Sequence, residues 1–131
     1  MGGYTIVRLG DAPDAFAGAY PGEMRLLTGA LETEQLAFTY RRMPQGTGGK
    51  GSYGHRHRTQ EEIYFLFSGK LEAKLDDDLV GLEAGTALRV APQVVRSLWN
   101  AEPEDAELVI VSVRLQGPGP DGVIVQDFWP A

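Results

Sequence analysis

The chain has 131 residues, of which 43% are hydrophobic and 23% are charged, a composition typical of one globular domain and unlike disordered or collagen-like chains. It contains no cysteine, which excludes disulfides, thiol nucleophiles and cysteine-ligated metal centres. The formal net charge of −6 disfavours nucleic acid and anionic membranes as partners.

Short apolar or alternating runs, separated by glycine, proline and aspartate, predict an all-β fold with little helix. One helical turn is expected at 11–16, where an aspartate precedes an early proline. The expected strands are 4–9, 24–28, 36–42, 61–67, 71–75, 87–91, 96–99, 108–113 and 123–128, with a hairpin turn at 76–78. We expect one domain over residues 1–131, built as a sandwich or barrel.

No targeting signal or membrane span is recognised in the sequence. Residues 1–10 lack a charged segment followed by an apolar one, and apolar runs such as 63–67 are far shorter than a transmembrane helix. We therefore expect a cytoplasmic protein without a membrane partner.

One stretch of this acidic chain is basic, because no acidic residue occurs between Glu34 and Glu61. Its many glycines predict a mobile loop over 46–54. Two interpretations are open: an exposed basic loop without a ligand, or a positive rim that attracts a small anionic molecule. The basic residues are Arg41, Arg42, Lys50, Arg56 and Arg58.

The only two histidines, His55 and His57, are separated by one residue. Residues i and i+2 of a strand point to the same face, so both rings can converge on one point. Glu61 and Glu62 follow, at the start of an apolar run. Two histidines and a carboxylate form a recognised ligand set for a divalent transition metal. The alternative is two surface histidines in a polar loop.

Glycines flank this group in the pattern Gly49-x5-His55-x-His57-x4-Glu62-x6-Gly69. Every spacing matches the first motif of the cupin superfamily, which the chain therefore resembles over roughly residues 46–113. The resemblance implies a jelly-roll-type antiparallel β-barrel of two sheets with a site in its interior. It also implies that His55, His57 and Glu62 are metal ligands.

A second pattern, Gly85-x5-Ala91, resembles the second cupin motif but departs from it. Asn100, the only asparagine, falls where that motif has one. Ala91 and Gln93 replace a proline and a glycine, and Arg96 stands where the family supplies a third histidine ligand. Arginine has five donors and no acceptor, so it cannot ligate a metal.

Three positions are therefore open to Arg96. It ion-pairs with Glu62 or Glu61 inside a metal-free barrel, or it points at a ligand carboxylate or phosphate beside a three-ligand metal, or it turns outward at the strand end. Alternation along the strand places Tyr64 and Leu66 on the interior face with Glu62, and Glu61 on the opposite face. We accordingly predict Glu62, and not Glu61, as the ligand.

These residues lead to expectations about function. The first is a small cupin that binds Fe, Mn, Ni or Zn and a small anionic molecule, with dioxygenase, decarboxylase and sugar isomerase chemistry all known in the family it resembles. The second is a metal-free ligand-binding or sensing barrel in which Arg96 replaces the charge of the metal. A third is a barrel without a site that serves as a partner module. The predicted ligand-binding residues are Arg96, Tyr64 and Gln93.

Two further expectations concern cofactors and assembly. No nucleotide cofactor is expected, because the glycines of 46–54 are not followed by a phosphate-binding Lys-Ser or Lys-Thr pair that opens a helix. The apolar terminal segments 4–9 and 123–129 are expected to cover sheet edges across a homodimer. The alternative is that both segments close on their own barrel.

Overall fold

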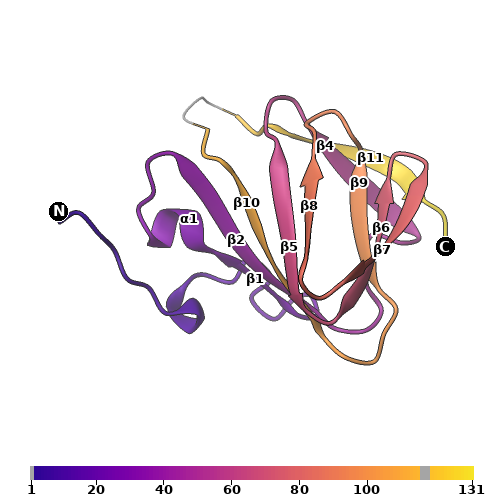
Figure 1. The fold of residues 1–131 in the computed structure, drawn as a ribbon, viewed down its shortest axis with the longest axis horizontal. Helices are drawn as coiled ribbons and strands as arrows, with labels where there is room; N and C mark the ends of the chain where they lie inside the picture. Colours follow the sequence, from indigo (N-terminus) through magenta and orange to yellow (C-terminus); the bar gives the residue numbers. More distant parts are fainter. Residues whose placement is uncertain (1, 116–118) are drawn as a thin grey trace.

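Two antiparallel sheets face each other in the computed structural model (Figure 1), which describes residues 2–115 and 119–131. The first sheet has the order β1 (Glu23–Leu26), β2 (Leu36–Met43), β10 (Ala106–Val113), β5 (Glu62–Ser68) and β8 (Thr86–Val90). The second has the order β11 (Gly122–Trp129), β4 (Ser52–His57), β9 (Arg96–Asn100), β6 (Lys70–Leu75) and β7 (Asp78–Glu83), with β3 (Thr47–Gly48) paired to β9. The predicted all-β jelly-roll architecture is confirmed.

The strands expected between residues 36 and 128 lie within two residues of their predicted bounds. The sequence did not predict β3, β4 and β7, whose residues are largely glycine, polar or exposed. The segment 46–54 is therefore not the expected loop, because it forms β3, a turn and the first half of β4. The expected hairpin turn is present between β6 and β7, with the last of its three aspartates already in β7.

The N-terminal strand expected at 4–9 is wrong. Tyr4 and Ile6 are exposed, and within the described residues the segment pairs with no strand. Val7 instead packs with Leu27 and Tyr40 in a small apolar cluster. The apolar side chains that suggested a strand are thus divided between solvent and this cluster, while the backbone remains irregular.

The helical turn expected at 11–16 is also wrong, since the 3-10 turn η1 (Leu9–Asp11) comes earlier. Asp14 Oδ1 instead accepts hydrogen bonds from the backbone N–H groups of Phe16 and Met24, both at 3.0 Å. The strand expected at 24–28 ends early, in helix α1 (Leu27–Ala30). No helix in the described parts of the chain is long and apolar enough to cross a membrane.

The main core fills the space between the two sheets. Alternation along β5 buries Tyr64 and Leu66 and leaves Ile63 and Phe65 exposed, as the period of two predicts. Gly69, between β5 and β6, has φ +82°, and a Cβ there would lie 2.5 Å from the Asp105 carbonyl oxygen. Glycine is therefore required at this turn, which connects one sheet to the other.

The C-terminal strand β11 pairs with β4 of its own chain. This is the alternative that the sequence left open for the C-terminal segment. The homodimer stays a prediction.

Asn100 joins the end of β9 to two neighbouring segments. It is fully buried, and its Nδ2 donates to the carbonyl oxygens of Met43 and Glu104, both at 2.8 Å. Its Oδ1 accepts from the N–H of Glu102 at 2.8 Å. Both N–H donors and the carbonyl oxygen of this side chain thus bond to the backbone within the fold.

Replacing Asn100 with alanine leaves these backbone groups without their partner. We expect Asn100→Ala to lower the free energy of unfolding by about 3 kcal/mol, because each buried polar group left unsatisfied costs ~1–3 kcal/mol. Urea denaturation measures the loss. Gln45→Ala is the matched control, since Gln45 is exposed and donates only to Ala101 O at 3.3 Å. Equal losses in the two variants would contradict a structural role for Asn100.

Candidate functional site

Both histidines project from β4, a strand of the second sheet. His55 lies opposite Arg96 in the register with β9. At the preceding position, a Cβ on Gly54 would lie 2.8 Å from Arg96 O and 2.5 Å from the ring of Phe128. Only glycine therefore allows β4 to approach β9 this closely, and this approach places His55 and His57 over the barrel interior.

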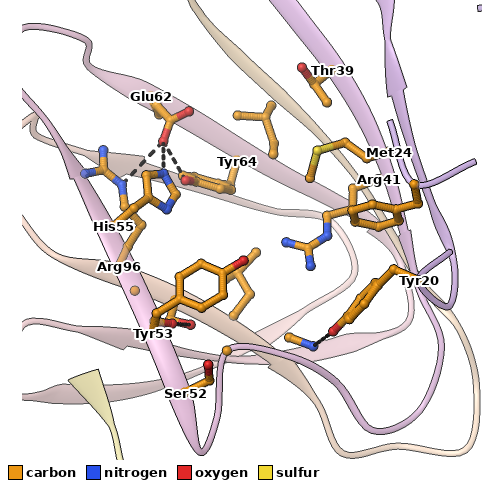
Figure 2. Close-up of a pocket in the computed structure, with 17 residues that line it drawn as sticks. Tyr20, Met24, Thr39, Arg41, Ser52, Tyr53, His55, Glu62, Tyr64 and Arg96 are labelled. Carbon is orange, nitrogen blue, oxygen red and sulfur yellow. Dashed lines mark hydrogen bonds and ion pairs between the residues drawn. The ribbon is translucent and has the colours of Figure 1, made fainter. Parts of the chain in front are cut away.

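Glu62 and Tyr64 face the histidines from β5, in the first sheet, and four side chains converge on Glu62 Oε1. His55 Nε2 lies 3.5 Å and His57 Nε2 3.4 Å from that oxygen, and Arg96 Nε also lies 3.4 Å away. The Tyr64 hydroxyl donates to it at 2.6 Å. Figure 2 shows the contacts of His55, Tyr64 and Arg96. The site thus joins the two sheets through one carboxylate oxygen.

These contacts keep Glu62 ionised. Burial by itself raises the pKa of Glu62, but hydrogen bonds from His55 and Tyr64 and the charges of His57 and His55 outweigh it, so the pKa lies below its ordinary value. Burial and the negative charge of Glu62 raise the pKa of Tyr64. Tyr64 therefore remains a neutral phenol that donates its proton to a charged carboxylate.

Asp121, just before β11, holds His57 from the side away from Glu62. Its Oδ2 lies 3.2 Å from His57 Nδ1, and its carboxylate also accepts from the Thr59 hydroxyl at 2.7 Å and the Gln60 N–H at 2.9 Å. Burial raises the pKa of Asp121, but the bonds from Thr59, Gln60 and His57 outweigh it and lower the pKa to about 2. An ionised carboxylate only accepts, so in the neutral ring Nδ1 carries the proton and Nε2 the lone pair.

Arg96 lies inside the barrel, with 1% of its surface exposed, so the outward orientation is wrong. Its Nη1 donates to the carbonyl oxygens of Pro92 at 3.2 Å and Val94 at 2.7 Å, while Nε forms the ion pair with Glu62. Its Nη2 is buried and has no hydrogen-bond partner among the described residues. Of the three expected positions, the structure shows the ion pair with Glu62.

A cavity of about 570 Å³ opens beside this group, and His55, Glu62, Tyr64 and Arg96 line it. This volume is in the range of small-molecule sites. Gln93, which the sequence placed with the ligand-binding residues, does not line the cavity. Its exposed side chain accepts from Arg56 Nη1 at 3.4 Å and donates to Arg58 O at 3.2 Å.

The basic stretch is divided by its strands. Arg41 lines the cavity, whereas its neighbour Arg42 forms ion pairs with Glu23 at 3.2 Å and Asp105 at 3.1 Å. Lys50 is exposed and does not line the cavity. Arg41 could not be separated from the other basic residues by sequence, because the prediction of a strand at 36–42 does not show which face of that strand lines the cavity.

The donor atoms present fit a divalent transition metal. One nitrogen each from His55 and His57 and one oxygen from Glu62 lie within 4.8 Å of one another. Imidazole nitrogen and carboxylate oxygen suit Fe, Mn, Ni and Zn, and Asp121 supplies the carboxylate that commonly orients a ligating histidine. Arg96 lies against the same carboxylate and gives this group a positive charge that the three donors lack.

Comparison with known proteins places these observations in a family. The family model described as "Cupin domain" matches residues 41–112, which is more than half of the chain. A search of curated proteins found no match.

Solved structures share the fold. A cupin protein from Bacteroides fragilis has 22% identity and a TM-score of 0.69, with 92% of each chain covered. A predicted oxalate decarboxylase from Thermotoga maritima has 22% identity and a TM-score of 0.67, covering 85% of this chain and 100% of that one. A cupin-superfamily sugar phosphate isomerase from Silicibacter pomeroyi has 17% identity and a TM-score of 0.69, covering 85% and 76%. Together with the match over residues 41–112, the two facing sheets and the His-x-His strand show that this chain belongs to the cupin family.

Proposed function

We propose that this cupin binds a divalent transition metal, Fe(II), Mn(II), Ni(II) or Zn(II), through His55, His57 and Glu62, and a small anionic molecule in the adjoining cavity. The observation that carries the proposal is the convergence of two imidazole nitrogens and one carboxylate oxygen within 4.8 Å of one another. With no cysteine in the chain, these donors are all nitrogen and oxygen, which favours these metals over those that prefer thiolates.

The hydrogen bonds behind His57 strengthen the case for a cation. Because Asp121 accepts the Nδ1 proton, the Nε2 lone pair of the neutral ring points at Glu62 Oε1, 3.4 Å away. Two electron-rich atoms facing each other repel unless a positive charge lies between or beside them. A metal ion meets this requirement for His57 and Glu62, and a nitrogen of His55 lies close enough to bind the same ion.

Each neighbouring residue then has a definite task. Tyr64 orients Glu62 through its 2.6 Å hydrogen bond, and Asp121 orients the His57 ring. Arg96 withdraws negative charge from Glu62, so we expect weaker metal binding than a site with four ligands provides. A bound ion would act as a Lewis acid toward an oxygen atom of the molecule in the cavity.

The comparisons support an anionic ligand by analogy. The names of two structural neighbours, a predicted oxalate decarboxylase and a sugar phosphate isomerase, refer to small anions. This cavity carries the cationic side chains Arg41 and Arg96. Positive charge in a partly enclosed cavity of a protein with net charge −6 favours a small anion over a neutral molecule.

A second candidate function is a metal-free ligand-binding or sensing barrel. The buried ion pair between Arg96 and Glu62 favours it, because a guanidinium already supplies positive charge where the metal would lie. A proton on His57 would then separate its Nε2 from the Glu62 oxygen. The two candidates differ in whether the protein binds metal, which can be measured directly.

Replacing Glu62 with glutamine tests the metal ligand set. We expect stoichiometric binding of Mn(II) or Zn(II) by untagged wild-type protein and its loss in Glu62→Gln, because an amide oxygen lacks the carboxylate charge. Glu61→Gln is the matched control, since Glu61 is exposed and pairs with Arg89 on the other face. Isothermal titration calorimetry measures both. Absence of metal binding from the wild type would support the metal-free barrel, whereas metal binding that survives in Glu62→Gln would contradict the assignment of Glu62 as a ligand.

Replacing Arg96 with histidine supplies the ligand that the family motif contains. We expect Arg96→His to tighten Zn(II) binding by at least tenfold, which corresponds to about 1.4 kcal/mol. Without metal the variant should be less stable, at the lower end of the ~3–5 kcal/mol typical of a broken buried pair, because Tyr64 still contacts Glu62. Thermal unfolding with and without Zn(II) measures both effects. A variant indifferent to metal would contradict the proposed position of the ion.

Replacing Asp121 with asparagine tests how His57 is oriented. We expect Asp121→Asn to lower metal affinity about 10–100-fold, as removal of such partners of metal ligands does, with little change in melting temperature. Thr59→Val is the control, because it removes one bond to Asp121 and keeps the contact with His57. An equal loss of affinity in Thr59→Val would show that the turn at 59–60, and not the His57 contact, is responsible.

A further inference from the structure

Arg41 reaches into the cavity from β2, across from the group around Glu62. Figure 2 shows its guanidinium directed into the cavity, with His55, Glu62 and Arg96 on the other side. The side chain is partly buried, and its Nε is shielded from solvent. The cavity therefore has a cation at each end, and their surroundings differ.

Arg41 has no polar partner among the described residues. No hydrogen bond or ion pair links its guanidinium to the rest of that part of the chain, and its Cζ lies 5.9 Å from the centre of the Phe16 ring. Arg42 and Arg96, in contrast, contact carboxylates. Shielding a charge from water without a partner is unfavourable, and burial lowers the pKa of Arg41 accordingly. A residue kept at such a cost to stability is typical of a binding site.

The walls around Arg41 indicate the chemistry of its partner. The rings of Tyr20 and Tyr53 lie on either side of the space that the guanidinium enters (Figure 2), and the Tyr20 hydroxyl accepts from the Gly48 N–H at 3.3 Å. The rest of the lining combines the apolar side chains of Phe16, Met24, Leu98 and Ile110 with the hydroxyl groups of Thr39, Ser52 and Ser97. One cation flanked by aromatic rings and apolar side chains matches one negative charge on an apolar body.

A singly charged carboxylate fits this end better than a phosphate dianion. A guanidinium binds a carboxylate through two parallel hydrogen bonds, and its charge is then neutralised by one partner. A phosphate dianion carries a second negative charge, which needs a second uncompensated cation. The charge of the other cation of the cavity, Arg96, is already compensated by Glu62, although its Nη2 has no hydrogen-bond partner among the described residues.

We infer that Arg41 binds the carboxylate of a small organic acid whose apolar or aromatic body lies between Tyr20 and Tyr53 and whose other end reaches His55 and Glu62. The inference rests on the proposed binding of a small anion, but it does not depend on the metal. It adds to the predicted ligand-binding residues a cation whose charge no carboxylate of the described residues compensates.

The test compares Arg41→Met with Arg42→Met, which changes the adjacent residue on the outward face of the same strand. The probes are acetate, benzoate and 3-phenylpropionate, together with the neutral amide of 3-phenylpropionate and phenyl phosphate. Binding is followed by calorimetry and by chemical-shift changes in NMR spectra. We expect 3-phenylpropionate to bind the wild type and Arg42→Met with equal affinity. Its affinity for Arg41→Met should be at least tenfold lower. The amide should bind all three proteins equally weakly.

Several results would overturn the inference. These are failure of every carboxylate to bind the wild type at millimolar concentration, equal affinity for acid and amide, or unchanged affinity in Arg41→Met. Tighter binding of phenyl phosphate than of the carboxylates would overturn the assignment of the carboxylate class. Arg41→Lys, which keeps the charge but loses the planar fork, should bind 3-phenylpropionate with intermediate affinity.

A measurement without ligand gives an independent check. Removing an unpaired, shielded charge should raise the melting temperature of Arg41→Met by ~2 °C or more, whereas Arg42→Met loses two ion pairs and should melt at or below the wild-type temperature. A lower melting temperature for Arg41→Met would mean that the guanidinium supports the fold, and would contradict a ligand-binding role.

The failure of this inference can be told from the failure of the proposed metal site. Arg41→Met should still bind Mn(II), because Arg41 contacts none of the three proposed ligands in the structure. If the wild type binds 3-phenylpropionate through Arg41 and takes up no metal, the metal proposal fails and the inference stands. If metal binds and no carboxylate does, the inference fails alone.

Discussion

One carboxylate oxygen, Glu62 Oε1, is the point on which the site depends. Two imidazoles, a phenol and a guanidinium from both sheets contact it, at distances between 2.6 and 3.5 Å. A charged oxygen in a largely buried position needs compensation, and the protein supplies it from three strands at once. The same requirement explains why Arg96 is nearly inaccessible, since its guanidinium lies against this oxygen inside the barrel.

The pleat of the strands divides neighbouring residues between two tasks. On β2, Arg41 enters the cavity while Arg42 forms surface ion pairs, and at the start of β5, Glu62 enters the site while Glu61 pairs with Arg89 outside. Identical residue types at adjacent positions thus belong to different environments. This makes adjacent substitutions informative, because the chain itself provides a control of the same residue type for Arg41 and for Glu62.

The sequence was sufficient for the parts of the site that are close in the chain. His55, His57 and Glu62 belong to consecutive strands, and their spacing together with the flanking glycines matched a family pattern. Asp121 could not be found this way, because it is 64 residues from His57 and reaches it only through the pairing of β11 with β4. The prediction of a strand at 4–9 was wrong, because apolar content alone does not show whether the backbone of a segment forms hydrogen bonds with a neighbouring strand.

The central claim is that the group around Glu62 holds a metal ion. Anomalous X-ray diffraction from crystals of the untagged protein soaked with Mn(II) tests it most directly, since the chain contains no histidine or cysteine outside this group. The account predicts one strong anomalous peak bonded to His55, His57 and Glu62, with Arg96 beside it. The absence of a peak there in fully soaked crystals, with Arg96 and Glu62 still in contact, would contradict it.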